Sequence, residues 1–150
     1  MAAPHPMYLL DTNILVLLIR DKDAGRGIAA NFGLRRGLHH CTISVVTVGE
    51  MYALAKKLDW EAAKINRIAE LLEEVIWVDI DDPAILRAYG ELDDFSYRLG
   101  HEMGKNDLWI AATVKVSGLT LLTTDGDFDH LHSAEITRIR IDDKTGNPLP

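Results

Sequence analysis

The sequence predicts an α/β fold, a three-layer sandwich in which helices cover both faces of a mostly parallel sheet of about five strands. Helix-like and strand-like stretches alternate from end to end of the 150 residues, as expected for strand–helix–strand crossovers. The first strand-like stretch, residues 7–10, is continuously apolar, which is typical of a strand covered on both faces. The length is that of one domain with its own core, so we predict a single domain over residues 1–150.

Turn and cap residues set the predicted boundaries of the elements. The predicted strands are residues 7–10, 39–43, 76–80, 119–123 and 135–141, and the predicted helices are residues 13–20, 27–36, 45–58, 60–75, 83–99 and 106–117. Ser44 suits an N-cap, Pro83 suits the first turn of a helix, and Gly118 suits a helix end. Residues 1–6 are predicted to be an extension, and the turn-rich residues 142–150 a frayed tail.

Composition narrows the range of functions. The 16 Lys and Arg residues against 23 Asp and Glu residues give a net charge of −7, which argues against a broad basic surface for nucleic acid. The single cysteine, Cys41, excludes an internal disulfide and fits a reducing compartment. No apolar run approaches the roughly 18 residues of a membrane span, and the first residues lack the pattern of a signal peptide. We therefore expect a cytoplasmic protein with no membrane partner.

Four acidic residues fall where ligand chemistry gathers in parallel sheets, at the carboxyl ends of strands and the helix starts beside them. Asp11 and Asp125 follow directly on predicted strands, whereas Glu50 and Asp107 lie in the first two turns of predicted helices. The helix stripes through Glu50 and Asp107 continue with apolar residues, so we expect both carboxylates to face inward. Taken singly, each acid also fits an ordinary role as a helix cap, a dipole partner, a turn residue or a solvated side chain.

Together, the four acids indicate a bound cation. Two carboxylates about 4 Å apart repel each other by roughly 4 kcal/mol at an effective dielectric near 20, so four cannot all stay ionised without compensation. An all-oxygen site, without a cysteine cluster or a helical pair of histidines, favours Mg²⁺ or Mn²⁺. The sequence therefore predicts a divalent metal site at this edge of the sheet.

Four segments carry these acids in order from about residue 7 to residue 131. They are Tyr8-Leu-Leu-Asp-Thr-Asn13, Ser44-Val-Val-Thr-Val-Gly-Glu50, Lys105-Asn-Asp-Leu-Trp-Ile-Ala-Ala112 and Leu121-Leu-Thr-Thr-Asp-Gly-Asp-Phe128. In sequence and spacing the four segments resemble the motifs of PIN-domain nucleases, and specifically of VapC-type toxins of toxin–antitoxin pairs. The resemblance implies a metal-dependent endoribonuclease with a parallel sheet, an RNA substrate, a homodimer and a cognate antitoxin protein as partner.

The resemblance also implies that Asp11, Glu50, Asp107 and Asp125 are the catalytic acids. Asp127 lies two residues after Asp125 and is the alternative for the fourth acid. We expect Asp11 and Asp107 to bind the principal Mg²⁺ (or Mn²⁺) and Asp125 to complete the site directly or through water. Glu50 would position a second ion or the attacking water, so the number of ions stays open.

Four further residues belong to the expected site, and two other functions stay open. Asn13 and Thr123 take the places of polar residues that support the acids, and Lys105 and Arg26 are candidates for contacting the substrate phosphate. One alternative is an RNA-binding or scaffold module of the same fold without turnover. The other is a phosphohydrolase for small phosphoesters, which would place a second Asp two residues after an Asp nucleophile. Asn13 occupies that position after Asp11.

Overall fold

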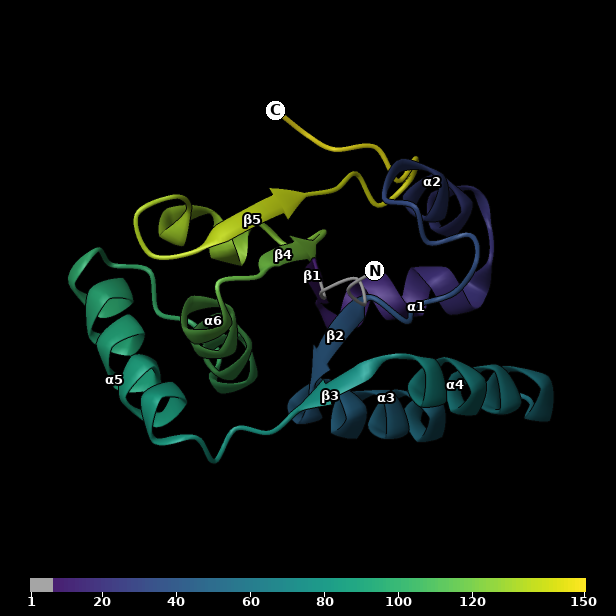
Figure 1. Ribbon diagram of the computed structural model, residues 1–150, viewed down its shortest axis with the longest axis horizontal. Helices are drawn as coiled ribbons and strands as arrows, with labels where there is room; N and C mark the ends of the chain where they lie inside the picture. The colour runs from purple at the N-terminus through teal and green to yellow at the C-terminus, as the bar shows by residue number, and fades with distance from the viewer. Residues whose placement is uncertain (1–6) are drawn as a thin grey trace, which may run out of the picture.

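The computed structural model describes residues 7–150 and contains a five-stranded sheet between two layers of helices (Figure 1). The strands are β1 (Tyr8–Leu10), β2 (Cys41–Ser44), β3 (Ile76–Val78), β4 (Thr120–Thr123) and β5 (Thr137–Arg140). They lie in the order β3-β2-β1-β4-β5, and each neighbouring pair is parallel. The predicted α/β sandwich is confirmed, with a sheet that is parallel throughout.

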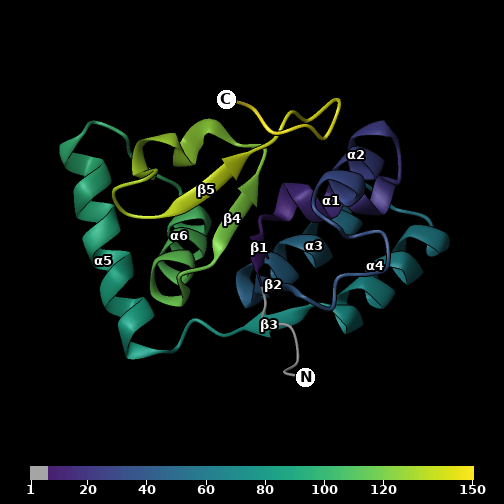
Figure 2. The ribbon, with the colours of Figure 1, turned by 45° about the horizontal axis from the view of Figure 1, so that its top comes forward.

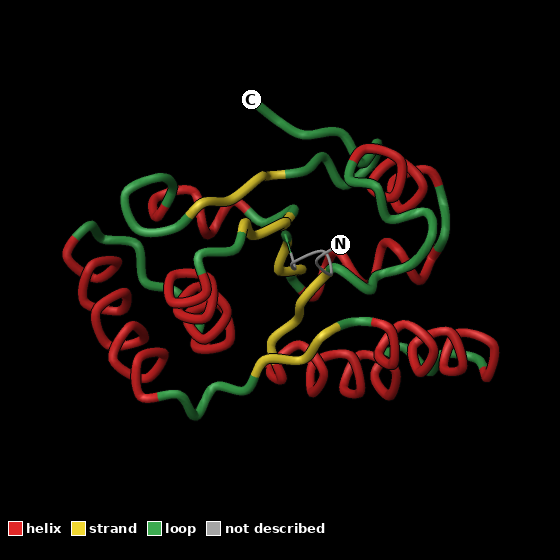
Figure 3. Tube along the Cα trace, in the orientation of Figure 1, coloured by secondary structure: helices red, strands yellow, loops and turns green. Residues whose placement is uncertain are grey.

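Helices cover both faces of the sheet (Figures 2 and 3). They are α1 (Thr12–Arg20), α2 (Asp23–Asn31), α3 (Val45–Lys57), α4 (Ala62–Glu74), α5 (Pro83–Arg98), α6 (Lys105–Ser117) and the short 3₁₀ helix η1 (Gly126–Leu131). Successive strand residues point to opposite faces, so Leu10 and Leu122 pack with α1 to α4, whereas Leu9 and Leu121 pack with α5 and α6. Between residues 7 and 150, no helix has the length and apolar character needed to cross a membrane.

Local signals fix several helix ends where the sequence predicts them. The Ser44 hydroxyl accepts a hydrogen bond from the Val46 backbone N–H (3.1 Å) and caps α3. Pro83 is the first residue of α5, and Gly118, with a φ of 70°, ends α6. The strands and the remaining helices differ from the prediction mainly at their ends.

The second helix differs from its prediction over residues 27–36, because α2 begins at Asp23 and ends at Asn31. Gly33 follows the helix with a φ of 71°, a conformation that stops helix propagation. Gly25 lies inside α2. A glycine is required there because a Cβ at this position would collide with the Leu17 backbone carbonyl in α1. Gly25, which falls between the predicted helices 13–20 and 27–36, thus allows α2 to pack directly against α1.

The chain after β5 is held in place, so the predicted frayed tail is wrong. Asn31 donates its side-chain N–H to the Gly146 carbonyl (3.0 Å), which ties the tail to α2. The Leu149 backbone N–H donates to the Arg140 carbonyl, and the Asp142 backbone N–H donates to the Asn147 carbonyl (both 2.8 Å). These hydrogen bonds satisfy backbone groups that a frayed tail would leave to water. The predicted extension, residues 1–6, lies outside the described residues.

Replacing Gly27 should loosen the contact between α2 and the tail. A Cβ at residue 27 would collide with the Thr145 carbonyl, so we expect Gly27→Ala to lower the free energy of unfolding by about 1–3 kcal/mol. Thermal and urea unfolding would measure the change. Gly90→Ala is the matched control, because no atom lies within 4 Å of a Cβ there, and alanine should stabilise α5 by about 0.5–1 kcal/mol. Equal effects of the two substitutions would contradict a packed tail.

Candidate active site

Asp11 lies at the carboxyl end of β1, where it caps α1. Its Oδ1 accepts a hydrogen bond from the Thr12 backbone N–H (2.8 Å), and its Oδ2 accepts from the Thr123 hydroxyl (2.7 Å) and the Asn13 side chain (3.1 Å). Asp11 is only 4% exposed, and this burial raises the pKa of its carboxyl, while the hydrogen bond from Thr123 opposes the rise. Its role as a helix cap is therefore real, and the same residue also faces the site.

Glu50 is brought to the site by a hydroxyl at the start of α1. The Glu50 Oε1 accepts a hydrogen bond from the Thr12 hydroxyl (2.7 Å), 38 residues away in the chain. The Thr12 hydroxyl also lies 3.1 Å from the hydroxyl of Thr47, which is buried one turn before Glu50 in α3. Thr12 is not among the site residues predicted from the sequence, although its position between Asp11 and Asn13 in the first motif was a usable signal.

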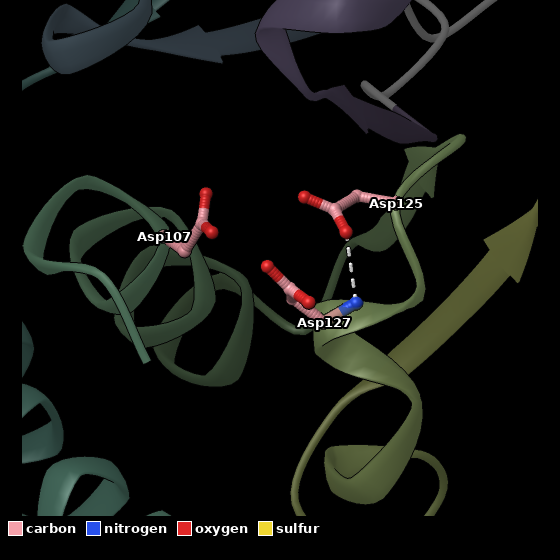
Figure 4. A group of neighbouring side chains, drawn as sticks. All are labelled: Asp107, Asp125 and Asp127. Atoms are coloured by element: carbon pink, nitrogen blue, oxygen red, sulfur yellow. Dashed lines mark hydrogen bonds between the residues drawn. The ribbon is translucent and has the colours of Figure 1, made fainter. Parts of the chain in front are cut away.

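Asp107, Asp125 and Asp127 point toward one another from α6 and from the start of η1 (Figure 4). One carboxylate oxygen from each residue lies within 4.8 Å of the others. The Asp125 Oδ1 accepts a hydrogen bond from the Asp127 backbone N–H (2.9 Å), so Asp125 also shapes the turn that carries Asp127. Both candidates for the fourth acid therefore lie beside Asp107, and Asp127 is the more exposed of the two.

Asp107 lies in the first turn of α6, and the pKa of its carboxyl is strongly raised. Its helix stripe continues inward with the buried residues Ile110, Ala111 and Val114, as the sequence predicts. Burial, followed by the negative charges of Asp11, Asp125, Asp127 and Glu50, raises the pKa of Asp107 from 3.8 to about 7. Ionising Asp107 near neutral pH is thus opposed by the rest of the site in the absence of a cation.

One cavity of about 360 Å³ collects the four acids Asp11, Glu50, Asp107 and Asp125. Asn13 and Thr124 also line it, and the Asn13 Oδ1 accepts a hydrogen bond from the Thr124 backbone N–H (3.2 Å). Thr123, the last residue of β4, supports the site by its hydrogen bond to Asp11. The predicted acids and their polar supports therefore come together at one end of the central strands.

The same cavity includes two charged residues that were not predicted from the sequence. Arg20 ends α1, and Asp143 belongs to the tail that folds back after β5. Arg20 carried no signal beyond ending an apolar stripe, and Asp143 lies in a segment with no sequence signal for a fixed position.

The two predicted phosphate contacts are not part of this cavity. Arg26 pairs with Asp21 (3.6 Å) and lines a separate cavity of about 470 Å³. Lys105 is the first residue of α6 and is exposed, outside the lining of the acidic cavity.

The donor set fits a hard divalent cation. Two oxygens on one Mg²⁺, each about 2.1 Å from the ion, lie roughly 3–4.2 Å apart. The oxygens of Asp107, Asp125 and Asp127, within 4.8 Å of one another, are close to this spacing. In the described part of the chain, no ion pair joins these three residues, Asp11 or Glu50 to a basic side chain. Oxygen donors without a cationic partner suit Mg²⁺ or Mn²⁺.

A comparison of sequences identifies the family. The sequence matches the family model of the PIN domain over residues 8–133. The chain belongs to the PIN domain family. This confirms the resemblance inferred from the four motifs, all of which lie in the matched region, whereas the tail after β5 lies beyond it. A search of curated protein sequences gives no match.

Solved structures share the fold of this PIN domain. VapBC2 from Rickettsia felis, bound to a DNA fragment from its promoter, matches with a TM-score of 0.72 and 22% identity over 91% of this chain and 99% of that chain. A toxin–antitoxin complex from Klebsiella pneumoniae matches with a TM-score of 0.63 and 25% identity over 83% and 92%. VapC20 from Mycobacterium tuberculosis, a toxin that cleaves the sarcin–ricin loop, matches with a TM-score of 0.60 and 20% identity over 87% and 98%.

Neutralising Asp107 should stabilise this PIN domain in the presence of a chelator. Because the pKa of Asp107 is about 7 in the folded chain against an ordinary 3.8, its ionisation opposes folding. This opposition is complete above about pH 7 and disappears as the pH falls toward 3.8. We expect Asp107→Asn to raise the free energy of unfolding by about 1 kcal/mol or more near pH 8, with a smaller gain near pH 5. Thermal melts in chelator would measure both.

The matched control is Asp82→Asn, because Asp82 is an exposed cap of α5 and asparagine caps a helix about as well as aspartate. This variant should show no pH-dependent gain. If Asp107 were only a first-turn dipole partner, Asp107→Asn would instead cost a few tenths of a kcal/mol at both pH values.

Proposed function

We propose that this PIN domain is a Mg²⁺- or Mn²⁺-dependent endoribonuclease and the toxin component of a VapBC-type toxin–antitoxin pair in the cytoplasm. The observation that carries the proposal is the convergence of Asp11, Glu50, Asp107 and Asp125 in one cavity, where none of the four forms an ion pair with a basic side chain of the described residues. The sarcin–ricin loop cleaved by VapC20 is RNA, which supports the choice of substrate class.

Each acid has a role that follows from its contacts. Asp107, with Asp125 or Asp127, would hold the ion, because their oxygens are the most closely grouped. Asp11 is held toward the same site by Thr123 and Asn13. A bound divalent ion supplies two effects, a lowered pKa of water and neutralisation of charge on the phosphate. Glu50, oriented by Thr12, would align the attacking water, so hydrolysis needs no covalent nucleophile from the protein.

The same solved structures support the choice of a protein partner. VapBC2 was solved with a fragment of promoter DNA, and the Klebsiella pneumoniae structure is a toxin–antitoxin complex; both match most of this chain. We infer a cognate antitoxin that blocks the acidic cavity or access to it, and a homodimer of this chain as the unit that binds the antitoxin. A nuclease that acts inside its own cell requires such a control.

RNA cleavage should require a divalent ion. We expect the purified protein to cleave a structured RNA with Mg²⁺ or Mn²⁺ and to lose this activity in excess EDTA, because the acids alone repel a phosphate. Denaturing gels of a labelled RNA hairpin would measure cleavage. Asp11→Asn and Asp107→Asn should lower the rate by at least about 100-fold, whereas the cap control Asp82→Asn should cleave like the parent.

Three results would each decide against parts of the proposal. Cleavage that persists unchanged in excess EDTA would exclude the metal mechanism. Tight RNA binding with no cleavage under any divalent ion would favour the scaffold alternative. Hydrolysis of p-nitrophenyl phosphate with no cleavage of RNA would favour a small-molecule phosphohydrolase.

Expression of the parent chain should arrest growth of a bacterial host, and Asp11→Ala should relieve the arrest because it removes a carboxylate from the acidic cavity. Growth curves with immunoblots, which establish equal protein levels, would measure this. Co-expression of the proposed cognate antitoxin should restore growth with the parent. Identical growth of cells with the parent and the Asp11→Ala variant would remove the support for a toxin.

A further inference from the structure

A second cavity, of about 350 Å³, adjoins the acidic cavity, and the two share the lining residues Leu17, Arg20 and Asp143. The second cavity lies where the end of α1 and the start of α2 meet the start of α4 and the tail after β5. Figures 1 and 2 show the tail running alongside α2. The two cavities therefore border each other at these three residues, and we refer to the pair as the groove.

The outer part of this groove is basic. Four cationic side chains line it, from three segments of the chain: Arg20 and Lys22 where α1 meets α2, Lys64 in α4, and Lys144 in the tail. None of the four takes part in an ion pair within residues 7–150, and Arg20, Lys22 and Lys144 are exposed. Lys64 is half-buried, with its Nζ 5.6 Å from the ring centre of Trp60. Two carboxylates, Asp23 and Asp143, also line this part of the groove, so cations outnumber acids two to one.

The tail holds Lys144 at this position. The Asp142 Oδ1 accepts hydrogen bonds from the backbone N–H groups of Lys144 (2.8 Å) and Thr145 (3.1 Å), which fixes the turn that carries Lys144. Asn31 in α2 anchors the same turn through Gly146. Because the match to the PIN domain family ends at residue 133, this side of the groove is an addition outside the matched region.

We propose that this basic groove binds the phosphodiester backbone of RNA next to the position of cleavage. The inference rests on the proposed function and assigns where the strand continues outside the acidic cavity. Lysine and arginine side chains that are free of ion pairs are the groups that neutralise phosphates and supply most of the affinity for nucleic acid. Because the whole chain has a net charge of −7, it repels a polyanion such as RNA at long range. Lysine and arginine side chains beside the acidic cavity are therefore needed to hold the RNA strand near the acids.

The test is RNA binding by charge-reversed variants of the full chain. Fluorescence anisotropy of a labelled RNA hairpin, with Mg²⁺ and with Asp107→Asn in every variant to prevent cleavage, gives the dissociation constant at several salt concentrations. We expect Lys64→Glu/Lys144→Glu to weaken binding about tenfold or more. The slope of log affinity against log salt should fall by about 0.7 for each phosphate that the variant no longer neutralises.

Three matched variants sharpen this test. Arg87→Glu reverses an exposed charge on α5, on the other face of the sheet, and should bind like the parent. Lys144→Arg keeps the charge and should also bind like the parent. Lys64→Glu could alter the contact between Lys64 and Trp60. The single variant Lys144→Glu leaves that contact in place, since Lys144 is exposed in the tail, and it should still lower the slope of log affinity against log salt.

The outcomes separate this inference from the proposed function. If Lys64→Glu/Lys144→Glu binds RNA like Arg87→Glu, the groove is not the RNA path, whereas metal-dependent cleavage by the parent would leave the proposed function intact. If the double variant keeps its RNA affinity but no longer binds the antitoxin, the groove is a protein interface and the inference is overturned. If the parent neither binds nor cleaves RNA, both proposals fail.

Discussion

The mutual repulsion of carboxylates at one edge of the sheet is the constraint that organises this PIN domain. Asp107 shows this repulsion added to the effect of burial, because burial first and the negative charges of the neighbouring acids second raise its pKa to about 7. The surrounding structure supplies hydrogen bonds where it can, from Thr123 and Asn13 to Asp11 and from Thr12 to Glu50. The negative charge that these contacts do not balance favours a divalent cation in this cavity, which is why the proposed function includes one.

The strand order explains how acids from distant parts of the chain meet. β1 lies at the centre, with β2 on one side and β4 on the other, so the chain reverses its direction of winding between β1 and β4. Ligand sites of open parallel sheets form at such a reversal, beyond the carboxyl ends of the strands. The hydrogen bond between Thr123 and Asp11 crosses this point and joins residues 112 positions apart. The same bond therefore links the carboxyl ends of β1 and β4 and orients an acid of the site.

The features of the fold and the site that depend on neighbouring residues in the sequence could be predicted, whereas those that depend on tertiary contacts could not. The caps at Ser44 and Gly118, and the acids that directly follow apolar strands, depend on neighbours in the sequence and were predicted at the right positions. The hydrogen bond between Thr12 and Glu50, and the tail against α2, depend on tertiary contacts that no local pattern encodes. Gly25 was predicted to lie between two helices. It lies inside α2, because the close approach of α1 requires a glycine there, and this contact is tertiary. Arg26 lies outside the acidic cavity and lines a separate one, which its place in the sequence did not indicate.

The dispersion of the acids along the chain has a consequence during protein synthesis. Asp11 is made first, Asp107 and Asp125 are made about 100 residues later, and the basic side of the groove is completed only after Lys144 has been made. β1, the central strand, obtains its second neighbour only when β4 has been made. A nascent chain on the ribosome, or one truncated before β4, therefore has no assembled cavity. The order of synthesis itself delays assembly of the acids until β4 and the residues directly after it have been made.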